Sequence, residues 1–267
     1  EARRAAATAL PPFARFGWVS PPVESTTHAR LAEFAGAGLD LMLPAQSDPG
    51  RPEDNLARLD LAAGQGLRCL IWDRRFNRYA TLEVNSAAGG ALLDSLVATY
   101  RGHPAFGGYY LGDEPPRSAF RLLGQLHHAL RARDPEHPAW NNLLSSPGVG
   151  GWSEWNSYVR DYLDSTGAAA LSYDEYDFLA TGDRGVYAQQ LARAAAIANQ
   201  YGIPFWVIMQ LTQHGPYRAV SDGEIAGPVD QKTRRGVAQR ERMLARRGAR
   251  IQRQQCRATQ GRCVQAL

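Results

Sequence analysis

Short apolar segments alternate with amphipathic segments along the first 211 residues of the chain. The apolar segments are rich in β-branched and aromatic residues, and Gly or Pro separates each from the Ala/Leu/Arg-rich segment that follows. The pattern predicts strands over 16–20, 39–45, 67–73, 105–114, 138–144, 168–176 and 203–211. Between them it predicts helices over 27–38, 52–66, 91–102, 118–134, 155–167 and 186–202.

Strands that are apolar almost throughout indicate a parallel sheet covered on both faces. A doubly wound sheet would meet this condition, but no glycine-rich phosphate loop follows the first predicted strand. The regular repeat therefore favours a (β/α)8 barrel of the triosephosphate isomerase (TIM) type. After Leu211 only a thin apolar stripe and the weak segment RCVQAL (262–267) remain. We expect an α/β fold of the TIM-barrel type that is incomplete or divergent at its eighth strand.

Charge and aromatic content separate the end of the chain from the rest. The net charge is +4, yet residues 225–267 alone carry +9, so the preceding 224 residues carry −5. All 25 aromatic residues lie at or before Tyr217. We predict a barrel domain of catalytic type over 1–224 and an Arg-rich tail, helical or disordered, over 225–267. The tail is either a divergent closing unit or the product of a truncated or frame-shifted gene.

Composition also limits the partners. The tail has no aromatic residue that could stack on a base, so no nucleic-acid partner is predicted. The sequence has no uninterrupted run of 18 apolar residues, so no membrane span is predicted. The first residues lack the apolar centre of a complete signal peptide but are compatible with a trimmed leader, which favours an extracellular or periplasmic location and leaves a cytoplasmic one open.

The three cysteines predict no metal site. Cys69 lies within an apolar run and is expected to be a buried thiol. Cys256 and Cys263 have no histidine nearby, and whether they form a disulfide is left open. No cofactor is predicted, and the oligomeric state is open.

Candidate site residues gather at the ends of the predicted strands. In a parallel barrel, the carboxyl ends of the strands form the rim that carries the active site. Carboxylates, amides and aromatic rings there suit a carbohydrate, because two carboxyl groups can split a glycosidic bond and rings can cover sugar faces. The rim residues are Trp72, Asp73, Asp113, Glu114, Asn141, Asn142, Tyr173, Asp174, Tyr176, Trp206, Gln210 and His214.

Glu114 is the predicted general acid/base. It ends the apolar strand in YYLGDEPP (109–116), where burial and the neighbouring Asp113 are expected to raise its pKa and keep it protonated near neutral pH. The alternative is that an acid before proline only caps a helix. Because successive strand residues point to opposite faces, Asp113 is expected to support Glu114 rather than to be its catalytic partner.

The stretches GYYLGDEPP (108–116), LSYDEYDF (171–178) and YGIPFWVIMQL (201–211) resemble the (β/α)8 glycoside hydrolases of the β-galactosidase type, close to bacterial family 42 and its retaining clan. The resemblance covers about 16–224. It implies that Glu114 is the acid/base, with Asp113 where the clan has asparagine. It also implies a nucleophilic glutamate at the end of strand seven, where this chain has Gln210.

The second carboxylate is therefore open. Asp174 is the first choice, and Glu224, Asp73 and Asp113 are alternatives. A separation from Glu114 well beyond about 6 Å would favour inversion of the anomeric centre.

We thus predict a glycosidase that acts on an oligo- or polysaccharide. One alternative is a carbohydrate-binding barrel without activity, favoured by Gln210 and by the weak eighth strand. A metal-dependent hydrolase using His28, Asp73, Glu114, Asp174 and His214 is disfavoured, because no HxH or HxxxH spacing occurs. His127 and His128 lie within a predicted helix, where packing or solvent exposure explains them.

Overall fold

A computed structural model describes residues 14–18, 20–45, 48–210, 213 and 215–221. The chain divides into two compact units. Unit 1 takes its described residues from Glu1–Asp177 and Gly185–Met209, and unit 2 from Phe178–Arg184 and Gln210–Leu267. His214, Glu224, Cys256, Cys263 and the predicted tail lie outside the described residues, so the domain boundary at 224 stays a prediction.

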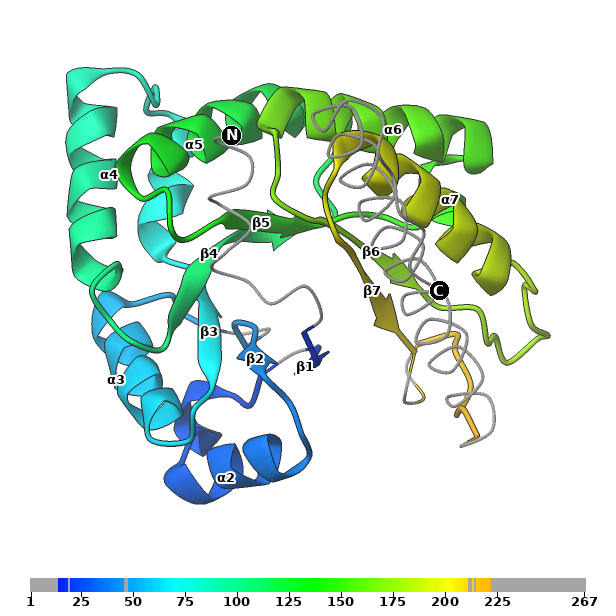
Figure 1. Cartoon of the computed structure of the whole chain (residues 1–267), viewed down its shortest axis with the longest axis horizontal. Coiled ribbons are helices and arrows are strands. Elements are labelled where there is room, and N and C mark those ends of the chain that lie inside the picture. The colour runs from blue at the N-terminus through cyan, green and yellow to red at the C-terminus, as the bar shows by residue number, and fades with distance from the viewer. Residues whose placement is uncertain (1–13, 19, 46–47, 211–212, 214, 222–267) are drawn as a thin grey trace, which may run out of the picture. The chain divides into compact units, whose positions relative to one another are not determined.

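Unit 1 contains a half-barrel of parallel strands (Figure 1). Five of them pair in sequence order and two pair separately, and a parallel bridge from Leu143 to Tyr173 joins the two sheets. Each observed strand lies inside a predicted one, which confirms the seven predicted strands; the described residues contain no eighth. The strands are β1 Phe16–Gly17, β2 Leu41–Met42, β3 Arg68–Ile71, β4 Phe106–Asp113, β5 Ala139–Asn142, β6 Leu171–Glu175 and β7 Phe205–Met209.

Helices connect successive strands and lie along the outside of the strands of unit 1 (Figure 1). All six predicted helices are present, but α4 begins earlier than predicted because the Ser86 hydroxyl caps it by accepting from the Gly89 amide. The helices are α2 His28–Gly36, α3 Pro52–Ala63, α4 Ala87–Tyr100, α5 Phe120–Arg133, α6 Trp152–Thr166 and α7 Tyr187–Tyr201. The short 3₁₀ helices are η1 Val23–Ser25, η2 Arg74–Ala80, η3 Arg117–Ala119 and η4 Ser146–Val149. None of the described helices is long and apolar enough to cross a membrane.

Apolar side chains cover both faces of the strands. Leu, Tyr and Phe side chains fill the layer between strands and helices, and Cys69 lies there fully buried, as predicted, with burial raising its thiol pKa to about 12. The inner face carries aromatic rings: Tyr110 lies 5.4 Å from Trp140, and Trp140 lies 6.1 Å from Trp206. These rings fill the interior of the half-barrel below the carboxyl ends of the strands.

Candidate active site

A β-bulge near the end of β4 determines where the acidic residues point. Tyr110 pairs with Trp140, but the next pairing is Asp113 with Asn142, so β4 holds one residue more than β5 between the two pairs. An extra residue turns the following side chain to the other face of the sheet. Asp113 therefore shares the inner face with Tyr110 and reaches the Asn142 side chain.

Glu114 departs from strand geometry as well. Its φ of 44° is the only positive value among the described residues other than glycine. Two contacts hold this turn: the Glu114 amide donates to the Asn142 carbonyl at 2.8 Å, and the Tyr158 hydroxyl donates to the Pro115 carbonyl at 2.8 Å. The expectation that Asp113 and Glu114 point to opposite sides is wrong, because alternation holds only for regular extended chain.

Asn142 joins two of the acids. Its side-chain amide donates to Asp113 Oδ1 at 3.1 Å and to Asp174 Oδ1 at 2.7 Å. The Ser172 hydroxyl donates to Asn142 Oδ1 at 2.9 Å, which fixes the orientation of the amide. Asp113 and Asp174, from β4 and β6, are therefore held around one donor group.

Asp174 is the buried acid of the site. Only 4% of its surface is exposed, and the side chains of Glu114 and Tyr176 are close enough to interact with it. Burial above all, together with the contact to Glu114 and the charges of both neighbouring acids, raises the pKa of Asp174 to about 8, against the Asn142 hydrogen bond that lowers it. Asp174 is thus mostly protonated at neutral pH.

The other two acids are open to solvent. Protein atoms around the Asp113 carboxylate still raise its pKa to about 6, and the Asn142 hydrogen bond opposes the increase. The predicted burial of Glu114 is wrong, because the structure leaves this residue exposed after the end of β4. Burial acts on Asp174 instead.

A pocket of about 280 Å³ adjoins this carboxyl cluster. It lies at the carboxyl ends of β1 to β4, and the rings of Trp18 and Tyr110 meet edge to face at 6.3 Å within it. Burial raises the pKa of Tyr110, and the nearby carboxyl charges add to the increase. The pocket is lined by Trp18, Leu43, Pro44, Ala45, Asp48, Trp72, Tyr110, Gly112 and Asp113.

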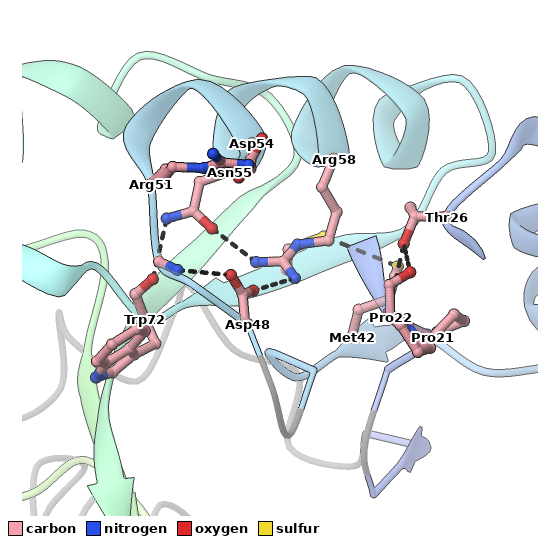
Figure 2. Close-up of polar contacts among 12 residues, drawn as sticks. Pro21, Pro22, Thr26, Met42, Asp48, Arg51, Asp54, Asn55, Arg58 and Trp72 are labelled. Carbon is pink, nitrogen blue, oxygen red and sulfur yellow. Dashed lines mark hydrogen bonds and ion pairs between the residues drawn. The ribbon is translucent and has the colours of Figure 1, made fainter. Parts of the chain in front are cut away.

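Trp72 is held in this wall by a buried polar network (Figure 2). The Asn55 amide donates to the Trp72 carbonyl at 2.9 Å, and Arg58 donates to Asn55 at 2.7 Å and to Asp48 at 2.5 Å. Gly50 has a φ of 62°, and a Cβ there would lie 2.3 Å from the indole ring. The ring therefore rests directly on the Gly50 backbone.

Several predicted site residues face elsewhere. Asp73 binds Arg75 and accepts a 2.5 Å hydrogen bond from the Tyr100 hydroxyl, so its carboxylate is engaged behind the pocket. Tyr173 is buried among the outer core residues with its ring 5.4 Å from Trp155, because it lies on the strand face opposite to Asp174.

The remaining predicted residues also make structural contacts. Asn141 faces the helices, where it meets His127 and Tyr162. Trp206 belongs to the inner aromatic core and is 2% exposed. Gln210 belongs to unit 2 and bonds to the backbone of Phe178 and Arg218. Of the predicted set, the structure gathers Trp72, Asp113, Glu114, Asn142, Asp174 and Tyr176 around the carboxyl cluster and its pocket.

The polar and aromatic residues that contribute to the site without having been predicted include Trp18, Asp48, Tyr110, Tyr158 and Ser172. A signal existed for Trp18, because it lies two residues after Phe16 in an apolar segment and so shares its strand face. For Tyr158 and Asp48 the sequence gives no signal, because their contacts depend on tertiary packing. Among the described residues, no three His, Cys, Asp or Glu side chains are grouped so as to hold a metal ion.

No family model and no curated protein sequence matches the chain. Similar solved structures include a plant β-glucan endohydrolase, with 15% identity, a TM-score of 0.48, and 73% of this chain and 74% of that chain covered. A glucosidase from Croceicoccus marinus has 13% identity, a TM-score of 0.48 and coverages of 75% and 52%. A GH5 cellulase from an Icelandic hot spring isolate has 12% identity, a TM-score of 0.45 and coverages of 78% and 78%.

These neighbours are glycoside hydrolases by their descriptions. The likeness concerns the path of the chain at low identity, so the function of this chain has to be argued from its own residues. The finer resemblance to family 42 stays a prediction.

Proposed function

We propose that the protein is a glycoside hydrolase that cleaves O-glycosidic bonds of an oligo- or polysaccharide. The observation that carries the proposal is the carboxyl cluster of Asp113, Glu114 and Asp174 beside an aromatic pocket at the carboxyl ends of the strands. Glycosidic cleavage requires a proton for the leaving oxygen and a second carboxylate at the anomeric carbon. The cluster contains a protonated acid and acids that reach solvent.

Glu114 and Asp174 act as one proton-carrying pair. The Glu114 side chain contributes to the raised pKa of Asp174, so the two carboxyl groups are immediate neighbours rather than groups held apart on opposite sides of a scissile bond. Asp174 is therefore not the partner across the scissile bond. It holds a proton in the interior and passes it to the exposed Glu114, which delivers it to the leaving oxygen as general acid.

Asp113 supplies the second function. It lines the pocket, and with a pKa of about 6 it is mostly ionised at neutral pH. Its carboxylate stabilises the positive charge that develops at the anomeric carbon while the bond to the leaving oxygen breaks and that oxygen takes the electron pair and the proton from Glu114. Water then attacks the anomeric carbon and gives its proton to the ionised Glu114. Trp18, Trp72 and Tyr110 offer ring surfaces for the sugar. A polymeric substrate agrees with the extracellular or periplasmic location that we propose.

The decisive experiment compares wild type with Glu114→Gln on a set of aryl glycosides and polysaccharides. Leaving groups that need no protonation depend little on a general acid, so we expect Glu114→Gln to lose roughly 10²–10⁴-fold on an alkyl glycoside and much less on a dinitrophenyl glycoside. Equal turnover by both proteins on every substrate would refute the assignment of Glu114. Saccharide binding without turnover in wild type would instead identify a binding barrel.

A further inference from the structure

A chain of hydrogen bonds runs from α5 to the bulge of β4, behind the carboxyl cluster. His127 Nε2 lies 3.0 Å from Asn141 Oδ1, and the Tyr162 hydroxyl donates to the same oxygen at 3.2 Å. The Asn141 amide nitrogen donates to the Gly112 carbonyl at 3.1 Å. His127, Asn141 and Tyr162 are all buried, so water does not substitute for these contacts.

The contact between Asn141 and Gly112 determines which group donates in each of these hydrogen bonds. A backbone carbonyl can only accept, so Asn141 must turn its Nδ2 to Gly112 and its Oδ1 to His127. With its proton on Nε2, His127 donates to this oxygen, and the Tyr162 hydroxyl, which lies 3.4 Å from Nε2, donates to the same oxygen. Burial lowers the pKa of His127 to about 4, so the imidazole is neutral at physiological pH and keeps this one donor. His127 thus donates to Asn141, and Asn141 donates to the Gly112 carbonyl.

Gly112 is where the chain acts on the site. It lies in the bulge with a φ of 126°, directly before Asp113 and Glu114. Two consecutive residues of β5 hold the bulge from its two faces: Asn141 through the Gly112 carbonyl, and Asn142 through the Asp113 carboxylate. The contact between Asn142 and Asp113 belongs to the carboxyl cluster itself. The contact between Asn141 and Gly112 lies outside the cluster and depends on His127.

We propose that His127 is a positioning residue, which acts through Asn141 and Gly112 to hold Glu114 against Asp174. The effect on turnover rests on the proposed function, but the effect on the geometry of the cluster does not. Without the His127 donor, Asn141 Oδ1 keeps only the 3.2 Å contact with the Tyr162 hydroxyl, so the side chain is held less firmly and its amide nitrogen can move away from the Gly112 carbonyl. The Gly112 carbonyl would then lose its partner and the bulge its outer support.

The test uses His127→Leu, the conservative His127→Gln, which retains an N–H donor, and His128→Leu as a matched control. His128 is the next residue of α5 and is exposed. The first measurement is the titration of Asp174 by carbon-detected NMR on ¹³C-aspartate protein, assigned with Asp174→Asn. We expect His127→Leu to lower the Asp174 pKa by about one unit or more as the contact with Glu114 loosens, and His128→Leu to leave it unchanged.

The second measurement is kinetic. A displacement of about 1 Å in a catalytic group can reduce turnover about 10²-fold, so kcat should fall by one to two orders of magnitude in His127→Leu with KM little changed. His127→Gln should recover most of both effects. An unchanged Asp174 titration in folded His127→Leu would overturn the proposal, even if that variant unfolds at a lower temperature.

The proposal can also be tested if His127→Leu does not fold or if the wild type has no activity. If His127→Leu does not fold, His127→Phe replaces it, because a phenyl ring fills the imidazole space without an N–H donor, and wild-type titration of Asp174 in that variant overturns the proposal. If wild type itself has no glycosidase activity, the proposed function fails, while the titration still decides whether His127 positions the cluster.

Discussion

Replacing Asp174 by asparagine should stabilise the protein, and increasingly so as the pH rises. The folded protein holds a proton on Asp174 up to a pH of about 8, whereas the unfolded chain releases it near the ordinary carboxyl pKa of 3.8. Raising the pH between these values therefore favours unfolding, because the folded state binds more protons. Each pH unit in this window costs the folded state about 1.4 kcal/mol.

Asparagine is close in shape to protonated aspartate and does not ionise. Between pH 5 and pH 7 the advantage of Asp174→Asn over wild type in unfolding free energy should thus grow by a few kcal/mol, with an upper limit near about 3 kcal/mol. Urea unfolding followed by tryptophan fluorescence at pH 5, 6, 7 and 8 measures this difference. Asp113→Asn is the control, since its advantage should stop growing above a pH of about 6. A difference for Asp174→Asn that is constant over this range would refute the reasoning.

Two other variants probe the wall of the pocket. Gly50→Ala forces a Cβ to within 2.3 Å of the Trp72 ring, so it should cost about 1–3 kcal/mol and weaken saccharide binding. The control is Gly66→Ala, because Gly66 has a similar positive φ but no atom within 4 Å of its added Cβ, so it should lose only the stability that backbone strain costs. If both variants lost equal stability to denaturant and equal saccharide affinity, a clash with Trp72 would be excluded. Arg58→Met leaves Asp48 buried without its ion-pair partner and should cost about 3–5 kcal/mol, with partial recovery on adding Asp48→Asn. If Arg58→Met lowered the unfolding free energy by less than about 1 kcal/mol, water rather than Arg58 would be compensating the Asp48 charge.

The order of strands and helices could be predicted from the sequence because each boundary has a local cause. Gly or Pro lies between the segments, and the apolar runs are long enough to distinguish strands from helices. The ends of the strands were less predictable. β2 pairs only over Leu41–Met42, although the apolar run covers 39–45, because pairing depends on the neighbouring strands as well as on the run itself.

The site was predictable in its place but not in its geometry. The carboxyl ends of parallel strands identified Asp113, Glu114 and Asp174, and the structure brings these three together. The bulge at Gly112 places Asp113 on the inner face, and the left-handed turn at Glu114 ends the alternation that the sequence prediction assumed. The glycine alone does not indicate the insertion, because glycine also occurs in regular strands. Glu114 is exposed because β4 ends in that turn, whereas Asp174 is buried because it lies within β6.

The aromatic rings on the inner face have an optical consequence. Trp140 and Trp206 come from β5 and β7, lie 6.1 Å apart and are both 2% exposed. Indoles this close should give an exciton signal in far-ultraviolet circular dichroism, where the indole transition is intense, and their burial should shift their emission to shorter wavelengths. The half-barrel thus contains its own spectroscopic reporter, which allows each variant to be checked for an intact interior before any substrate has been identified.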